Sequence, residues 1–261
     1  MRYLRLAAAF FRVALLGELA YRANFWWRLF QSLLNLGVAL VGVWVIFSYT
    51  DNLGGWKPEE VIALVGVYLL VGGIMGLIIQ PGMEELIESV RTGELDFILT
   101  KPEDSQILVS IRRYDIWEII DFFLGTGVLV VALMRLGNQI GGIEAIEFAL
   151  LLLCGGIIVY CFWLMLSSLS FWLVRVENIL VIFQSLYEAG RWPISLYPGW
   201  LRYGLTFIVP VAFAVTVPAE ALTGRLNWPT VIGAAALAVG LFILSRAIWK
   251  AGMRRYSGAS A

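Results

Sequence analysis

The chain has 261 residues, of which 60% are hydrophobic and only 15% are charged, and its mean hydropathy is +0.83. This composition favours a membrane protein over a soluble domain. Basic and acidic residues number 19 each, so the zero net charge gives no indication of a nucleic-acid partner. Histidine is absent, which weighs against most hydrolases and metalloenzymes because it is the commonest general base and metal ligand.

The N-terminal segment, residues 1–24, is predicted to be an amphipathic helix lying on the membrane surface. Projected as a helix, its polar residues share one side, opposite Leu6, Phe10 and Val13. The polar residues are Arg2, Arg5, Arg12, Glu18 and Arg22. A helical extension of the first span is the alternative interpretation.

Six apolar segments are predicted to span the membrane, because a bilayer core needs about 20 apolar residues in a helix. They cover residues 25–47, 61–79, 116–134, 146–169, 179–196 and 231–249. The fifth is the least regular, since it contains Glu188, Arg191 and Pro193. Residues 205–222 are also apolar but carry Pro210 and Pro218.

The distribution of Lys and Arg predicts the orientation of these spans. With a cytoplasmic N-terminus, the external loops keep only Lys57, Arg202 and Arg225. The basic C-terminus must also be inside, so the number of crossings is even. Six crossings result if residues 197–227 dip into the outer leaflet and return as broken helices, which membranes tolerate where protein buries the backbone. The predicted fold class is an all-α integral membrane protein, a single domain over residues 1–261.

The internal loop, residues 83–115, is the most informative stretch. "MEELIESVR" predicts a short helix that ends at Gly93, and "LDFIL" is a small apolar cluster between charged residues. Pro102 disfavours helix at Lys101, and Asp104 or Ser105 can cap a helix that runs on into the third span. An apolar centre with a charged rim is typical of a docking surface for another protein. An ordinary structured loop fits the composition equally well.

Charged residues inside the apolar segments are candidates for a transport path. Glu188 and Arg191, at spacing i, i+3, could pair on one face of the fifth span or snorkel together at the outer interface. Asp115, Glu118 and Asp121 are interpreted as a solvated inner helix face. Gln31 and Asn35 in the first span could bond a neighbouring helix or face a polar path.

Small residues predict close helix packing in two spans. The pair Gly72 and Gly76 lies in the second span, and Gly233, Ala236 and Gly240 lie in the last one. Motifs for catalysis or nucleotide binding do not occur. There is no G-x-x-x-x-G-K-[ST] phosphate loop, no zinc-ligand spacing and no G-x-S-x-G nucleophile elbow.

Three passages together resemble the ABC-2 type permeases, in particular a bacterial branch encoded beside a separate ATPase and often a second permease. "ELAYRANFWWRLFQSLL" is similar to the entry into the first span, and "GRWPISLYPGWLRYGLTFIVPVAFAVTVPAEAL" is similar to the stretch after the fifth. "SVRTGELDFILTKPEDSQ" resembles the family's G-x-L-D-x-x-L-x-x-P loop, through Gly93, Leu95, Asp96, Leu99 and Pro102. The resemblance extends over the whole chain.

The resemblance implies the membrane subunit of an ATP-driven exporter of an amphiphilic or lipid-like substrate in the bacterial inner membrane. ATP and Mg²⁺ would be held by a partner ATPase, and this chain would carry no catalytic, cofactor or metal site. The implied ATPase contacts are Glu94, Leu95, Asp96, Phe97, Leu99, Lys101 and Pro102. A second permease, identical or paralogous, would complete the path, with Glu188 and Arg191 near its outer exit.

Two other functions remain open on the sequence. The first is a membrane-embedded enzyme that acts on lipid, and the second is a non-transporting scaffold or sensor subunit. The docking hypothesis makes a sharper prediction, because a charge placed in the apolar cluster would uncouple the ATPase. Leu95→Asp and Phe97→Asp are therefore expected to insert normally but to lose coupling.

Overall fold

The computed structural model describes residues 2–18, 22–137, 141–173 and 176–256. This part of the chain is helical and contains no strand, so the predicted all-α class is confirmed. The longer helices are α1 (Arg2–Glu18), α2 (Arg22–Phe47), α3 (Pro58–Ile74), α7 (Ile119–Leu136), α8 (Gly142–Ser168) and α12 (Trp228–Met253). The shorter ones are α4 (Gln80–Thr92), α5 (Leu95–Leu99), α6 (Ser105–Ile111), α9 (Glu177–Glu188), α10 (Gly199–Tyr203) and α11 (Val217–Leu222).

Five helical segments of the described chain are long and apolar enough to cross a membrane. They are Asn24–Phe47, Pro58–Thr92, Ile116–Leu136, Gly142–Phe171 and Trp228–Met253. A sixth candidate is a bent pair, Gly199–Ile208 with Ala212–Leu222, whose two halves meet at a bend of 78°. The number of possible spans is therefore five, or six if the bent pair counts as one.

The predicted fifth span, residues 179–196, is shorter in the structure than expected. Its helix α9 continues only as a 3₁₀ turn to Arg191, and Trp192 is extended. Pro193 explains this end, because proline disfavours helix at the preceding residue. The segment is consequently not among the five candidate spans.

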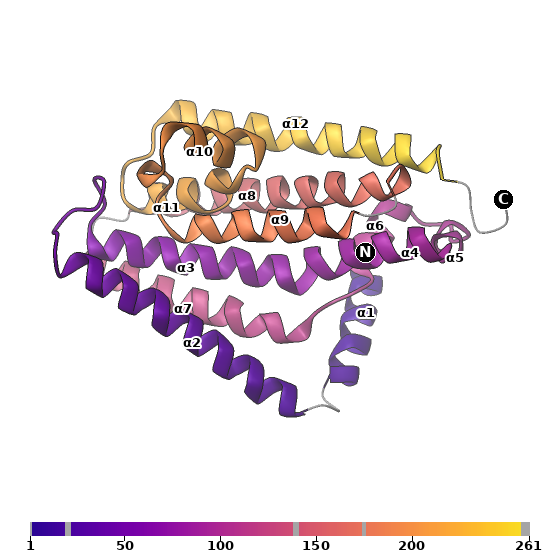
Figure 1. Cartoon of the computed structure of the whole chain (residues 1–261), viewed down its shortest axis with the longest axis horizontal. Coiled ribbons are helices and arrows are strands. Elements are labelled where there is room, and N and C mark those ends of the chain that lie inside the picture. The colour runs from indigo at the N-terminus through magenta and orange to yellow at the C-terminus, as the bar shows by residue number, and fades with distance from the viewer. Residues whose placement is uncertain (1, 19–21, 138–140, 174–175, 257–261) are drawn as a thin grey trace.

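The long helices form a bundle whose two ends differ (Figure 1). Helices α3, α8, α9 and α12 run alongside one another. One end, called here the loop end, carries α1, α5 and α6; the other, called the bent-pair end, carries α10, α11 and the loop before α3. Arg135, in the last turn of α7, lines one pocket with Phe47 and Pro58, which flank the loop before α3. It therefore also lies at the bent-pair end, and the basic residues expected there were undercounted from the sequence.

The second span continues without interruption into the loop. One helical segment runs from Pro58 to Thr92, whereas the sequence predicted a span followed by a separate short helix. A π-helical turn, Met75–Ile79, joins α3 to α4 just before Pro81. Proline has no N–H, so the backbone pairing must adjust there. The helix ends at Gly93, whose φ of 81° is left-handed, as predicted.

Helices α3 and α7 pack backbone against backbone through glycine. A Cβ atom on Gly73 would lie 2.5 Å from the Phe122 nitrogen, and one on Gly66 would lie 2.9 Å from the Leu129 nitrogen. The predicted contacts in the last span are not made within the described chain, because a Cβ on Gly233 or Gly240 would meet open space. Among the described glycines, the closest approaches to another helix's backbone are therefore those between α3 and α7.

The N-terminal helix α1 runs across the direction of the bundle at the loop end (Figure 1). Its Leu4, Val13 and Leu16 side chains are exposed, whereas Glu18 accepts a 2.6 Å hydrogen bond from the Trp117 indole. The exposed face of α1 also carries Arg5 and Arg12, so it is amphipathic, and α1 runs in another direction than α2. Both features fit the predicted surface helix better than an extension of α2. The Arg22 side chain, part of the same prediction, lies outside the described residues.

Candidate functional site

The short helix α5 divides the predicted ATPase contacts into two sets. Leu95 is fully buried and Ile98 is 3% exposed, so both pack into the core of the chain. Phe97 is 73% exposed and Leu99 is 37% exposed. The i, i+3 spacing of Leu95 and Ile98 explains the division, because residues three apart share one face of a helix. Leu95 therefore has no surface to offer a partner in this structure.

The exposed residues form a small surface around α5. Glu94, Lys101 and Pro102 are exposed together with Phe97 and Leu99, while Asp96 is half-buried. This set, Glu94, Phe97, Leu99, Lys101 and Pro102, is called the α5 surface below. It combines two apolar side chains with charges of both signs.

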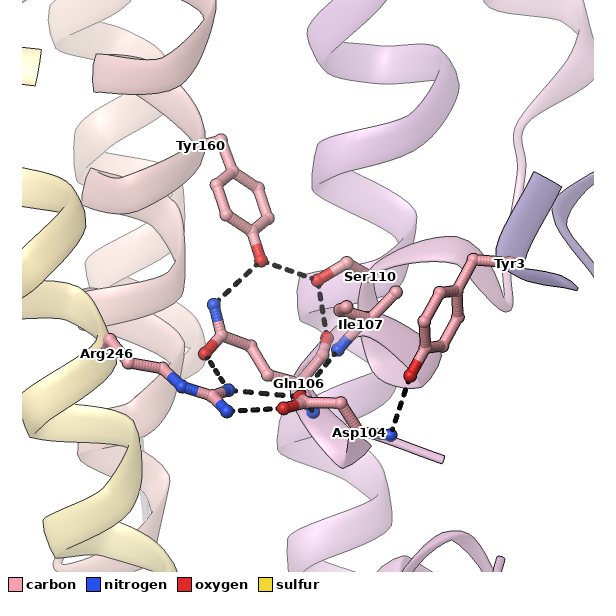
Figure 2. A network of polar contacts seen from close by, with 7 residues as sticks. All are labelled: Tyr3, Asp104, Gln106, Ile107, Ser110, Tyr160 and Arg246. Atoms are coloured by element: carbon pink, nitrogen blue, oxygen red, sulfur yellow. Dashed lines mark hydrogen bonds and ion pairs between the residues drawn. The ribbon is translucent and has the colours of Figure 1, made fainter. Parts of the chain in front are cut away.

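A polar network holds the base of this loop to the bundle (Figure 2). Asp104 caps α6, accepting hydrogen bonds from the backbone N–H groups of Gln106 and Ile107 at 3.0 and 3.4 Å. Arg246 of α12 donates to both Asp104 carboxylate oxygens and, at 2.6 Å, to the Gln106 side-chain oxygen. The hydrogen bonds from Arg246 hold the pKa of the Asp104 carboxyl below its ordinary value.

The same network reaches α8 and α1. Gln106 donates to the Tyr160 hydroxyl at 3.2 Å, and that hydroxyl lies 2.9 Å from the Ser110 hydroxyl oxygen. On the other side, the Tyr3 hydroxyl accepts from the Asp104 backbone at 3.3 Å, as Figure 2 shows. Four helices, α1, α6, α8 and α12, thus meet at the base of the loop. The sequence pointed to Asp104 as a cap but gave no signal for its partners.

The cap at Asp104 is confirmed, but α6 does not run on into the third span. It ends at Ile111, and a 3₁₀ turn begins at Ile116 after a non-helical stretch. The acidic row beyond it is not a solvated face, because Arg28 of α2 forms ion pairs with Glu118 and, at 3.6 Å, with Asp115. Arg112 pairs with Glu85 of α4 at 3.1 Å.

Glu188 and Arg191 line a polar cavity of about 220 Å³ between helices α2, α3, α7 and α9. Asn35, Tyr68 and Asp121 line it too. No ion pair joins Glu188 to Arg191, so the predicted pairing is not formed. The Arg191 guanidinium lies 5.3 Å from the centre of the Tyr68 ring instead.

At the bent-pair end, the Arg225 side chain binds the loop before α3 and the first turn of α3. It forms an ion pair with Glu60 and donates to the Gly55 carbonyl, and its guanidinium lies 4.9 Å from the centre of the Trp56 ring. Glu60 also accepts a 2.6 Å hydrogen bond from the Lys57 backbone. The arrangement joins the segment after α11 to the start of α3.

An all-helical chain with five apolar helices of membrane-spanning length is a multi-pass membrane protein. The profile of the family described as ABC-2 family transporter protein matches residues 33–260, and the chain belongs to that family. It is thus a membrane transport subunit and not itself catalytic. No curated protein and no solved structure matches the chain.

Proposed function

We propose that this chain is the permease subunit of an ATP-driven exporter of an amphiphilic or lipid-like substrate. ATP would be hydrolysed, with Mg²⁺, on a separate ATPase subunit. Family membership supports the class, and the arginines of α1, of α4 and of the stretch between α6 and α7 support a cytoplasmic position for the loop end. The bent pair would then be re-entrant at the outer face, with α9 completing six crossings in a bacterial inner membrane.

The observation that carries the ATPase contact is the exposure of Phe97. This side chain belongs to α5, in the polar segment that follows the helix from Pro58 to Thr92. It therefore lies beyond the apolar part of the second span. An aromatic side chain that is 73% exposed outside the bilayer favours a protein partner, since aromatic anchors are enriched at interfaces. We expect the α5 surface to dock on the ATPase.

The base of the loop supports transmission of movement from that contact. The α5 surface follows α4 directly, and the Arg246–Asp104 contact ties the next helix, α6, to α12. Displacement of α5 would therefore act on two spans at once, the one ending at Thr92 and the one ending at Met253. A loosely held loop would absorb such a displacement.

The polar cavity supports a path within the membrane. Charged residues at membrane depth are costly and line pathways. Glu188, Arg191 and Asp121 face one cavity next to the second span, although their helices are distant in sequence. A second permease, identical or paralogous, would close this side in the assembled transporter.

Co-expression and co-purification with an ABC ATPase from the same genome test the proposal. Phe97→Asp should keep the wild-type yield and thermal unfolding temperature but reduce the bound ATPase by about tenfold, the effect of one interface anchor. Phe97→Leu is the matched control and should keep most of the binding. Wild-type ATPase binding by Phe97→Asp would contradict the proposed contact.

Reconstitution of the pair in vesicles separates the other functions. An exporter should show substrate-stimulated ATP hydrolysis and flux of an amphiphile. Binding without stimulation or flux would favour a scaffold or sensor subunit. Lipid conversion by the isolated chain, without ATPase, would favour the membrane-embedded enzyme.

A further inference from the structure

A pocket of about 600 Å³ lies between the bent pair and the start of α12. One face of each half of the pair lines it, because Arg202 and Thr206 are four residues apart, and Phe213, Thr216 and Glu220 are three and four apart. Asn227, the N-cap of α12, lines the third side. The pocket is separate from the polar cavity and from the α5 surface.

Two opposite charges line this pocket without pairing. Neither Arg202 nor Glu220 forms a side-chain ion pair, with the other or with any residue of the described chain. Arg225, the neighbouring cation, is already bound to Glu60. Glu220 is half-buried, and a half-buried charge ordinarily finds a partner because its desolvation is costly, whereas Arg202 is exposed. Two unpaired opposite charges in one pocket fit a ligand that carries both signs.

Neutral groups in the pocket add hydrogen-bonding capacity. The Asn227 side-chain oxygen accepts from the Thr230 backbone N–H at 3.1 Å and from its hydroxyl, which leaves the amide nitrogen without a partner in the described chain. The Thr216 hydroxyl is buried and also lacks a partner there. Phe207 and Phe213, next to the bend, supply apolar walls. The pocket is therefore amphiphilic.

We propose that this pocket binds a zwitterionic lipid whose head group carries a phosphate and a primary ammonium. The Arg202 guanidinium and the Asn227 amide would donate to the phosphate, and the Glu220 carboxylate would accept from the ammonium. A quaternary ammonium has no N–H to donate, and a purely anionic head group would leave Glu220 unpaired and repelled. The phenylalanines would contact the adjoining glycerol and acyl carbons.

The class of ligand follows from the pocket alone, whereas its position in the outer leaflet rests on the proposed orientation. The test therefore uses the purified chain in detergent, without ATPase or transport. Its failure leaves the Phe97 experiment unaffected, and the reverse also holds.

Native mass spectrometry can measure retention of dioleoyl phosphatidylethanolamine, phosphatidylcholine and phosphatidylglycerol. The wild type should retain the ethanolamine lipid severalfold over the other two. Glu220→Gln and Arg202→Gln should each weaken that retention about tenfold, the effect of one charge-assisted hydrogen bond. Arg135→Gln and Glu144→Gln remove one charge of each sign outside this pocket and should leave it unchanged.

Competition on the wild-type chain keeps the proposal testable if a variant misfolds. Soluble phosphoethanolamine should displace the ethanolamine lipid at lower concentration than phosphocholine or inorganic phosphate does. Equal retention of the three lipids, or wild-type retention by both Glu220→Gln and Arg202→Gln, would overturn the proposal. Binding of free phosphoethanolamine without retention of any lipid would refute the lipid as ligand and assign the pocket to a soluble compound.

Discussion

The loop end and the bent-pair end of the bundle use charge in different ways. At the loop end, Asp104 is paired with Arg246, Glu103 with Arg2, and Glu85 with Arg112, and these pairs join separate segments of the chain. At the bent-pair end, one cation, Arg225, is similarly tied to Glu60. Arg202 and Glu220 form no ion pair with each other, although they line the same pocket.

The difference separates charges that hold helices together from charges that are available to a ligand. A paired charge at a helix junction stabilises one arrangement and fits the transmission of movement from the α5 surface. A charge in a pocket that forms no ion pair contributes little to stability until a ligand binds. Stability measurements on the two kinds of charge should therefore differ. Of the four predictions below, given in order of decreasing effect, the last three test this difference.

The largest effect should come from the α3–α7 contact, which connects the two ends. Gly73→Val places side-chain carbons where the Phe122 backbone already lies, so the helices must separate. We expect a loss of about 3 kcal/mol or more in the free energy of unfolding, measured by denaturant titration in detergent. Gly240→Val, which enters open space, is the control and should change stability by less than about 0.5 kcal/mol.

Arg225→Gln should have the next largest effect, because it leaves the nearly buried Glu60 carboxylate without its cation. We expect a loss of about 2–3 kcal/mol in the same titration. Adding Glu60→Gln removes the uncompensated charge and should recover part of the loss, which a double-mutant cycle would measure. Full additivity of the two substitutions would mean that the pair contributes nothing.

Arg246→Gln should cost about 1–2 kcal/mol, since the Asp104 pair is partly exposed and solvent weakens it. The effect should depend on pH. The pKa of Asp104 is lowered in the folded chain, so its stabilisation is present above the ordinary aspartate pKa of about 3.9 and is lost as pH falls through the lower, folded value. The stability difference between wild type and Arg246→Gln should therefore shrink below about pH 4. A difference that stays constant with pH would show that another contact of Arg246 carries it.

The smallest effect on stability should come from Arg202→Gln and Glu220→Gln. Neither side chain forms an ion pair in the described chain, so each substitution should change the free energy of unfolding by less than about 0.5 kcal/mol without added lipid. A loss above about 1.5 kcal/mol would show that these charges are structural and would remove the contrast between the two ends.

Local signals in the sequence predicted local structure well. Gly93 ends its helix with a left-handed backbone and Asp104 caps the next one, because both effects depend on a few neighbouring residues. The apolar cluster "LDFIL" was recognised, but its composition could not show that Leu95 faces inward while Phe97 faces outward. That orientation depends on where α4 and α6 lie.

Long-range contacts could not be predicted in the same way. Arg246 and Asp104 are 142 residues apart, and each alone is consistent with an ordinary charged loop or helix end. The polar cavity joins Glu188 to Asp121 and Asn35 from three helices, which only packing reveals. The fifth helix ends earlier than the predicted residue 196, because hydropathy was given more weight than Pro193.

The π-helical turn Met75–Ile79 determines how α4, which follows it, is rotated about the helix axis relative to α3, which precedes it. A π turn holds one residue more than an α-helical turn, and one residue corresponds to a rotation of about 100° around the helix axis. Before the turn, α3 packs against α7, and after it, α4 packs against α6 and α8. The turn therefore determines the direction in which α5 projects from the loop end of the bundle. Removing one residue there would leave α3 against α7 but point Phe97 about 100° away from its present direction.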